Sequence, residues 1–187
     1  ITKAVKDGDF FENPALLRAM KNAAENNTTL HLMGLLSDGG VHSHIDHLLA
    51  LLDMAKVNNV SDVVVHCWLD GRDVPPRSAA GYFEKLEKHM EETGLGRIGV
   101  ISGRFYAMDR DKRWERLEKA YDALVLSEGP KAENWQTALE NSYVDDVSDE
   151  FVVPVVVTPE PVKDGDSVIF FNYRPDRARE LTRALTD

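Results

Sequence analysis

Residues 30–44 have the sequence Leu-His-Leu-Met-Gly-Leu-Leu-Ser-Asp-Gly-Gly-Val-His-Ser-His. The run is mostly apolar until it stops at Asp38, Gly39 and Gly40. A short apolar run bounded by Asp and Gly is typical of a buried parallel strand, and the two glycines can adopt the positive φ that a tight turn requires. We therefore expect a strand, a loop and then a helix. Functional groups should gather where the strand ends, because ligands bind at the carboxyl edge of open α/β sheets.

The same pattern recurs along the chain. Apolar runs predict further strands over residues 62–69 and 97–103, a last strand over residues 167–173, and an edge strand over residues 151–157, which Pro154 interrupts. Helices are predicted over residues 13–27, from about 43 to 54, over 78–94, 114–124 and 134–143, and from Pro175 onwards. Alternating strands and helices predict an α/β fold with a mostly parallel sheet and helices on both faces, and antiparallel pairing of the edge strand is left open.

The composition argues against several classes of function. The chain has 187 residues, a hydrophobic content of 43% and a formal net charge of -10. No apolar run approaches the roughly 20 residues that span a bilayer, and the acidic balance argues against a nucleic-acid or membrane partner. Cys67 is the single cysteine and lies in an apolar segment, so we expect a buried structural thiol and a cytoplasmic location.

Charged residues gather at the predicted ends of the strands. That edge of the sheet should carry His42, Arg72, Asp73, Arg104, Arg110, Arg174 and Arg177. A surface salt bridge is the commoner explanation for any single arginine. Five arginines on one edge of an acidic protein favour a small ligand with phosphate and carboxylate groups, because a guanidinium binds both bidentately. Asp73 is the carboxylate expected within reach of a ligand hydroxyl, although a purely turn-forming role for it stays open.

Other chemistry has weaker signals. A zinc or manganese site is conceivable because imidazole and carboxylate groups lie close in sequence, although solvated or hydrogen-bonded roles are commoner for such residues. The candidates are Asp38, His42, His44, Asp46 and His47. Covalent catalysis has no candidate, because neither Ser37 nor Ser102 lies in a Gly-x-Ser-x-Gly elbow.

Four motifs in order give the chain a specific resemblance. They are Leu-Ser-Asp-Gly-Gly-Val-His-Ser-His at 36–44, Leu-Asp-Gly-Arg-Asp at 69–73, Ser-Gly-Arg-Phe-Tyr-Ala-Met-Asp-Arg-Asp-Lys-Arg-Trp at 102–114 and Asn-Tyr-Arg-Pro-Asp-Arg at 172–177. Together they resemble the cofactor-independent, or bisphosphoglycerate-independent, phosphoglycerate mutases of glycolysis, over essentially the whole chain. The resemblance is to the inserted phosphotransferase domain only. That domain holds phosphoglycerate while a serine of a metal-dependent, phosphatase-like domain carries the phosphate between the 2- and 3-hydroxyls.

The resemblance assigns substrate contacts to the same residues that the strand ends single out. These are His42, Arg72, Asp73, Arg104, Arg110, Arg174 and Arg177. For Asp73 we also expect a role as catalytic base, with Arg72 keeping its carboxylate ionised. The implied partners are 2-phosphoglycerate, 3-phosphoglycerate and the missing phosphatase-like domain.

Nothing in the chain matches the family's phosphorylated serine or its two-manganese ligands. We therefore expect residues 1–187 to be a single phosphotransferase domain, excised from a larger two-domain enzyme and inactive by itself. No cofactor is expected in it, and two manganese ions are expected in the missing domain. Two alternatives stay open: a non-catalytic anion-binding module with this fold, and a metallohydrolase that uses Asp38, His42 and His44.

Overall fold

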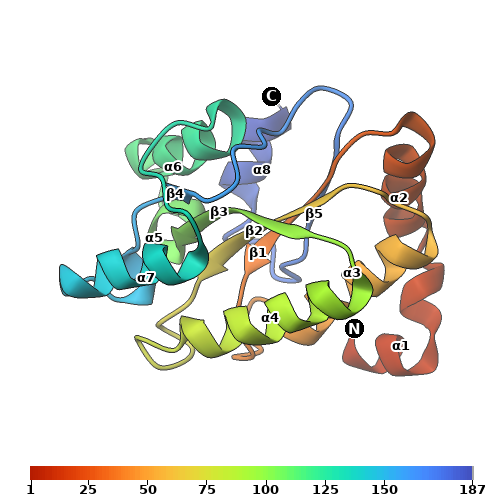
Figure 1. The fold of residues 1–187 in the computed structure, drawn as a ribbon, viewed down its shortest axis with the longest axis horizontal. Helices are drawn as coiled ribbons and strands as arrows, with labels where there is room; N and C mark the ends of the chain where they lie inside the picture. Colours follow the sequence, from red (N-terminus) through yellow and green to blue (C-terminus); the bar gives the residue numbers. More distant parts are fainter. Residues whose placement is uncertain (187) are drawn as a thin grey trace.

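Five strands form one sheet in the order β4-β3-β2-β1-β5 (Figure 1). The computed structural model describes residues 1–186. The strands are β1 (Leu30–Leu35), β2 (Val63–Leu69), β3 (Arg97–Gly103), β4 (Val155–Val156) and β5 (Ser167–Phe170). Strands β1, β2, β3 and β5 run parallel, whereas β4 pairs antiparallel with β3. The predicted α/β fold is confirmed, and the edge strand is antiparallel.

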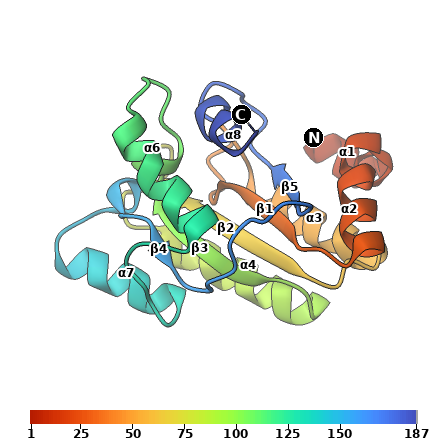
Figure 2. The same ribbon diagram turned by 90° about the horizontal axis from the view of Figure 1, so that it is seen from above.

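Helices cover both faces of the sheet, as predicted (Figure 2). They are α1 (Thr2–Asp7), α2 (Pro14–Asn26), α3 (Ile45–Val57), α4 (Ala79–Thr93), α5 (Arg104–Ala107), α6 (Trp114–Tyr121), α7 (Trp135–Val144) and α8 (Arg179–Thr186), with shorter helical turns at Asp9–Glu12, Asp122–Leu126 and Asp149–Phe151. Among residues 1–186, no helix is both long and apolar enough to cross a membrane.

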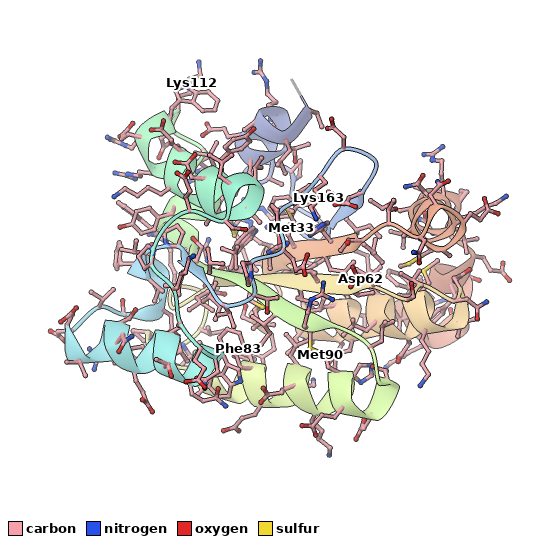
Figure 3. All side chains as sticks on the ribbon, turned by 45° about the horizontal axis from the view of Figure 1, so that its top comes forward. Met33, Asp62, Phe83, Met90, Lys112 and Lys163 are labelled. Atoms are coloured by element: carbon pink, nitrogen blue, oxygen red, sulfur yellow. The ribbon has the colours of Figure 1, made fainter. Side chains whose placement is uncertain are left out.

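The core lies in two layers, one on each face of the sheet. Successive strand residues point to opposite faces, so Leu32 joins the layer beneath α3 and α4, and Met33 joins the layer beneath α6 and α8. Figure 3 shows Met33 on one side of the sheet and Phe83 and Met90 of α4 on the other. Every residue of β1 and β2 is buried, because both faces of these central strands are covered.

Three helix starts differ from or refine the prediction. Helix α3 begins at Ile45 rather than near Ser43, because the backbone of His44 is extended and its ring caps the helix by accepting a hydrogen bond from the amide of Asp46. Ser78 precedes α4 as predicted, but its hydroxyl turns to Pro75, and the cap is the distant carboxylate of Asp149, which accepts hydrogen bonds from the amides of Ser78 and Ala79. The last helix begins at Arg179 rather than Pro175, since residues 175–178 form turns.

Two strands are shorter than predicted. Strand β4 contains only Val155 and Val156, because Pro154 lacks an amide hydrogen and Phe151 lies in a 3₁₀ turn. Strand β5 ends at Phe170 instead of Tyr173. Beyond the end of β5, the amide of Leu35 in β1 donates to the side-chain oxygen of Asn172 at 2.9 Å. This bond replaces a main-chain hydrogen bond between β1 and β5.

A buried polar chain crosses the sheet between β3 and the turn before β5. The amide of Val100 donates to Nδ1 of His66, Nε2 of His66 lies 2.9 Å from Nδ1 of His31, and Nε2 of His31 lies 3.2 Å from Asp166. Because Nδ1 of His66 accepts, the proton of each neutral ring sits on Nε2. Burial lowers the pKa of both histidines, so the chain of hydrogen bonds is satisfied with neutral rings. Cys67 is buried as predicted, and burial raises the pKa of its thiol.

Gly99 makes room for this polar chain. A Cβ atom at Gly99 would lie 2.5 Å from Cγ1 of Val64 and 2.7 Å from Cε1 of His66. We expect Gly99→Ala to lower the free energy of unfolding by about 1–3 kcal/mol, because neither neighbour can move without breaking packing or a hydrogen bond. Gly81→Ala in α4 is the matched control: its Cβ would meet nothing within 4 Å, and Ala should stabilise the helix by up to about 1 kcal/mol. Urea denaturation measures both, and equal effects would contradict the steric argument.

Candidate functional site

Asp70, directly after β2, organises the edge of the sheet where the predicted site residues gather. Its Oδ1 atom accepts hydrogen bonds from the amides of Arg72 and Asp73 at 3.2 and 2.9 Å and from Nη1 of Arg104 at 2.7 Å. Its Oδ2 atom accepts from the Ser37 hydroxyl at 2.6 Å. Burial alone would raise the pKa of Asp70, but these hydrogen bonds outweigh it and the pKa lies below its ordinary value. The carboxylate is therefore a fixed, ionised anchor for the loops around it.

Arg104 links this anchor to Asp73. Its side chain is only 3% exposed and its Nη1 atom lies 2.7 Å from both Asp70 and Asp73. Burial alone would lower the pKa of Arg104, but the hydrogen bonds that it donates to the two carboxylates raise it. Arg104 contacts only the Oδ2 atom of Asp73 and makes no hydrogen bond to Oδ1. Asp73 thus has a fixed orientation beside the site.

Arg72 is not the partner that sequence proximity suggested for Asp73. Its Nη1 atom lies 3.3 Å from Oε1 of Glu150, and its side chain is 61% exposed. Arg72 was expected to keep the Asp73 carboxylate ionised, but its guanidinium group forms its ion pair with Glu150. The partner of Asp73 comes instead from Arg104, at the end of the neighbouring strand.

A second cluster surrounds Asp176, on the loop after β5. Its Oδ2 atom accepts hydrogen bonds from Arg110 at 3.0 Å and from Arg174 at 3.1 Å. Nδ1 of His42 lies 3.8 Å from its Oδ1 atom. Burial and the guanidinium groups of Arg104 and Arg174 lower the pKa of His42, against the opposing charges of Asp176 and Asp73. The ring is therefore neutral at neutral pH.

Arg177 differs from the other arginines of the site. Its Nη1 atom donates to the carbonyl of Met108 at 3.0 Å, its Nε atom is buried without a partner, and it forms no ion pair with a carboxylate of residues 1–186. Burial, followed by the charges of Arg104 and Arg110, lowers its pKa. A half-buried guanidinium among other cations gains stability from any anion that reaches it. Three buried atoms without a partner in the described chain lie at this edge: Nδ1 of His42, Oδ1 of Asp176 and Nε of Arg177.

The structure brings the seven predicted site residues to one edge of the sheet. Asp73 and Arg104 lie in one cluster, and His42, Arg110 and Arg174 in the other. Arg177 is within electrostatic reach of Arg72 and Arg104. Their individual roles stay predictions.

Sequence reasoning missed three carboxylates that hold these residues: Asp70, Glu150 and Asp176. For Asp70 a signal was present, since it directly follows an apolar strand. Asp176 likewise stands between two predicted site arginines, in the segment Arg-Pro-Asp-Arg.

The residues suggested for a metallohydrolase do not converge. Nδ1 of His44 accepts a hydrogen bond from the amide of Asp46 and caps α3, Asp38 accepts one from the Tyr82 hydroxyl, and His42 lies with the arginines. Within residues 1–186 there is no group of three or more His, Cys, Asp and Glu side chains that could hold a metal ion. The geometry therefore does not favour this alternative.

Known proteins match the whole chain. The sequence family described as "BPG-independent PGAM N-terminus" matches residues 1–187. Enzymes named 2,3-bisphosphoglycerate-independent phosphoglycerate mutase from Clostridium beijerinckii and Clostridium perfringens are 59% and 58% identical to it. Each match covers 100% of this chain and 38% of the relative, so the chain spans well under half the length of these curated relatives.

A solved structure has the same fold. It is a crystal structure of Leishmania mexicana phosphoglycerate mutase at low cobalt concentration, 30% identical in sequence, with a TM-score of 0.94. The match covers 100% of this chain and 36% of that one. On the match to its entire length, the chain belongs to the family of BPG-independent PGAM N-termini.

Proposed function

We propose that this chain is the phosphoglycerate-holding domain of a mutase that interconverts 3-phosphoglycerate and 2-phosphoglycerate. The phosphoserine that carries the phosphate, and two manganese ions, belong to a phosphatase-like domain in the remainder of a longer cytoplasmic protein. The names of the Clostridium relatives support the mutase activity, and their greater length leaves room for a further domain. Within residues 1–186 no group of three or more His, Cys, Asp and Glu side chains could hold a metal ion. The part proposed for this chain is to bind and orient the substrate.

The observation that carries the proposal is the half-buried Arg177 without an ion pair, beside two clusters of guanidinium groups. In most of the site, carboxylates already neutralise the arginines, as Asp176 does for Arg110 and Arg174. Arg177 has no such partner among the described residues, so it supplies the excess positive charge that an anion satisfies. A phosphate or carboxylate group placed there would gain charge-assisted hydrogen bonds.

Asp73 supplies the chemistry that arginines cannot. Moving a phosphate between neighbouring hydroxyls requires one hydroxyl to lose a proton and the other to gain one. The Asp73 carboxylate is held by Arg104 through one oxygen only, so its other oxygen can accept a hydrogen bond from a hydroxyl of glycerate and then its proton. The site thus combines anion-binding cations with one oriented base.

We expect 3-phosphoglycerate to bind the 187-residue chain more weakly at high salt than at low salt, because exposed charges are screened.

Arg177→Lys tests the role of the guanidinium group that has no ion pair among the described residues. Lys keeps the charge but loses the planar fork, so Arg177→Lys should weaken binding about tenfold. Arg18→Lys on the exposed surface of α2 should bind like the wild type. Titration calorimetry decides, and wild-type affinity in Arg177→Lys, or equal heats for glycerate and 3-phosphoglycerate, would contradict a phosphate-directed site.

Asp73→Asn tests the proposed base, in the longer enzyme that contains this chain. An amide keeps the shape and can still accept one hydrogen bond, but it cannot take a proton. We expect kcat to fall at least about a hundredfold, with a smaller change in KM. Steady-state kinetics in both directions measure this. Turnover within a few fold of the wild type combined with a collapse of affinity would make Asp73 a positioning residue and place the base elsewhere.

A further inference from the structure

Asp176 contacts three of the residues of the proposed anion site. One oxygen, Oδ2, accepts hydrogen bonds from both Arg110 and Arg174. The other, Oδ1, lies 3.8 Å from Nδ1 of His42. Within residues 1–186, this Oδ1 and this Nδ1 are both buried without a partner. Buried unpartnered polar atoms are costly, and an approach of about 1 Å would turn the two into a hydrogen-bonded pair.

The backbone holds the two loops in place for this pairing. The amide of Tyr173 donates to the carbonyl of His42 at 2.8 Å, which ties the loop after β5 to the loop after β1. Pro175 lies between this bond and Asp176, and its ring restricts the backbone of the intervening segment. The carboxylate therefore lies 3.8 Å from His42 on a loop that the backbone holds beside it, and rotation of the two side chains can close the remaining distance.

The position of the proton on His42 decides what the ring can do. The groups that face the ring are Arg104, Arg174, Asp176 and Asp73, and with burial their net effect keeps it neutral at neutral pH. A neutral imidazole carries one proton, on the nitrogen whose partner best accepts it. A carboxylate beside Nδ1 favours the proton there, which leaves Nε2 as an acceptor.

We propose that Asp176 is a positioning residue of the anion site: Oδ2 fixes the guanidinium groups of Arg110 and Arg174, and Oδ1 accepts the Nδ1 proton of His42, so that Nε2 accepts a hydrogen bond from a ligand hydroxyl. The assignment rests on the proposed function in so far as the ligand carries both an anionic group and a hydroxyl. Asp176 does not exhaust the donors of the two arginines. Their side chains are 47% and 45% exposed, and each gives Asp176 a single hydrogen bond, which leaves further N–H groups for a ligand.

The test uses ¹⁵N NMR of the histidine rings in the 187-residue chain at pH 7.5, without ligand, followed by titration with inorganic phosphate. In the wild type we expect the His42 proton on Nδ1. In Asp176→Ala it should move to Nε2, and the dissociation constant for phosphate should rise about tenfold because Arg110 and Arg174 lose their common anchor. In Asp176→Asn the amide oxygen can still accept the Nδ1 proton. The tautomer should therefore persist, while His42 titrates at a lower pH than in the wild type because the negative charge is gone.

Asp111→Asn is the matched control. Asp111 is an exposed carboxylate next to Arg110, so this variant removes the same charge near the site without touching His42. It should leave the tautomer unchanged and the phosphate affinity within about twofold. Circular dichroism and urea denaturation establish that each variant folds. If Asp176→Ala does not fold, the titration of His42 in Asp176→Asn decides.

An unchanged His42 tautomer in Asp176→Ala would overturn the proposal. So would tighter phosphate binding in that variant, because it would show that Asp176 competes with the anion for the two guanidinium groups. The tautomer is read without ligand, so it tests the His42 assignment separately from the proposed function. A chain that binds neither phosphate nor 3-phosphoglycerate, but whose His42 tautomer depends on Asp176, refutes the function and supports the pairing.

Discussion

The buried carboxylate of Asp70 ties together the ends of the three central strands. It accepts hydrogen bonds from Ser37 after β1, from the amides of Arg72 and Asp73 after β2, and from Arg104 after β3. Burying an ionised carboxylate is costly unless hydrogen bonds engage both of its oxygens. The hydrogen bonds that offset this cost for Asp70 also hold in place the loops that donate them. Removing this carboxylate would leave Arg104 paired only with Asp73 and would free the turn that aims Asp73. The geometry of the site therefore depends on a residue that needs no contact with a ligand.

The charge of the site is set locally and not by the protein as a whole. The chain carries a formal net charge of -10, yet positive groups are concentrated at the carboxyl edge of the sheet. Most of these arginines are already paired with carboxylates that hold them in place. Pairing lowers the attraction that each arginine exerts on an anion, but it also removes conformational entropy that binding would otherwise cost. Arg177, without an ion pair in the described chain, restores the excess of positive charge. Because carboxylates hold these arginines in fixed positions, the site can select an anion by its shape as well as by its charge.

The sequence predicts the fold class because its signals are local, although it missed α1 (Thr2–Asp7), which precedes the helix predicted as the first, and the short α5 (Arg104–Ala107). Apolar runs broken by Gly, Pro and Asp predict the strands, and the helices lie within a few residues of their predicted bounds. The errors arise where a distant side chain takes part. Asp149 caps α4 from about 70 residues away, and Asn172 replaces a ladder bond of Leu35. The site shows the same limit. The seven candidates follow from strand ends, but Asp73 pairs with Arg104, 31 residues further along, rather than with its neighbour Arg72. Only the packed structure determines which carboxylate reaches which guanidinium.

The two clusters differ in burial, and this difference bears on how a ligand is held. Arg104 is almost completely buried against Asp70 and Asp73, so its position is set before any ligand arrives. Arg110 and Arg174 are nearly half exposed and are held by Asp176 through one oxygen. An ordered inner cluster favours a fixed orientation of Asp73 toward a hydroxyl, whereas the outer arginines keep free donors that can follow an anionic group. A ligand that must turn its hydroxyls while its charged ends stay bound needs both properties. The division between a rigid inner cluster and a more exposed outer cluster is what links the packing of this domain to the phosphate transfer proposed for it.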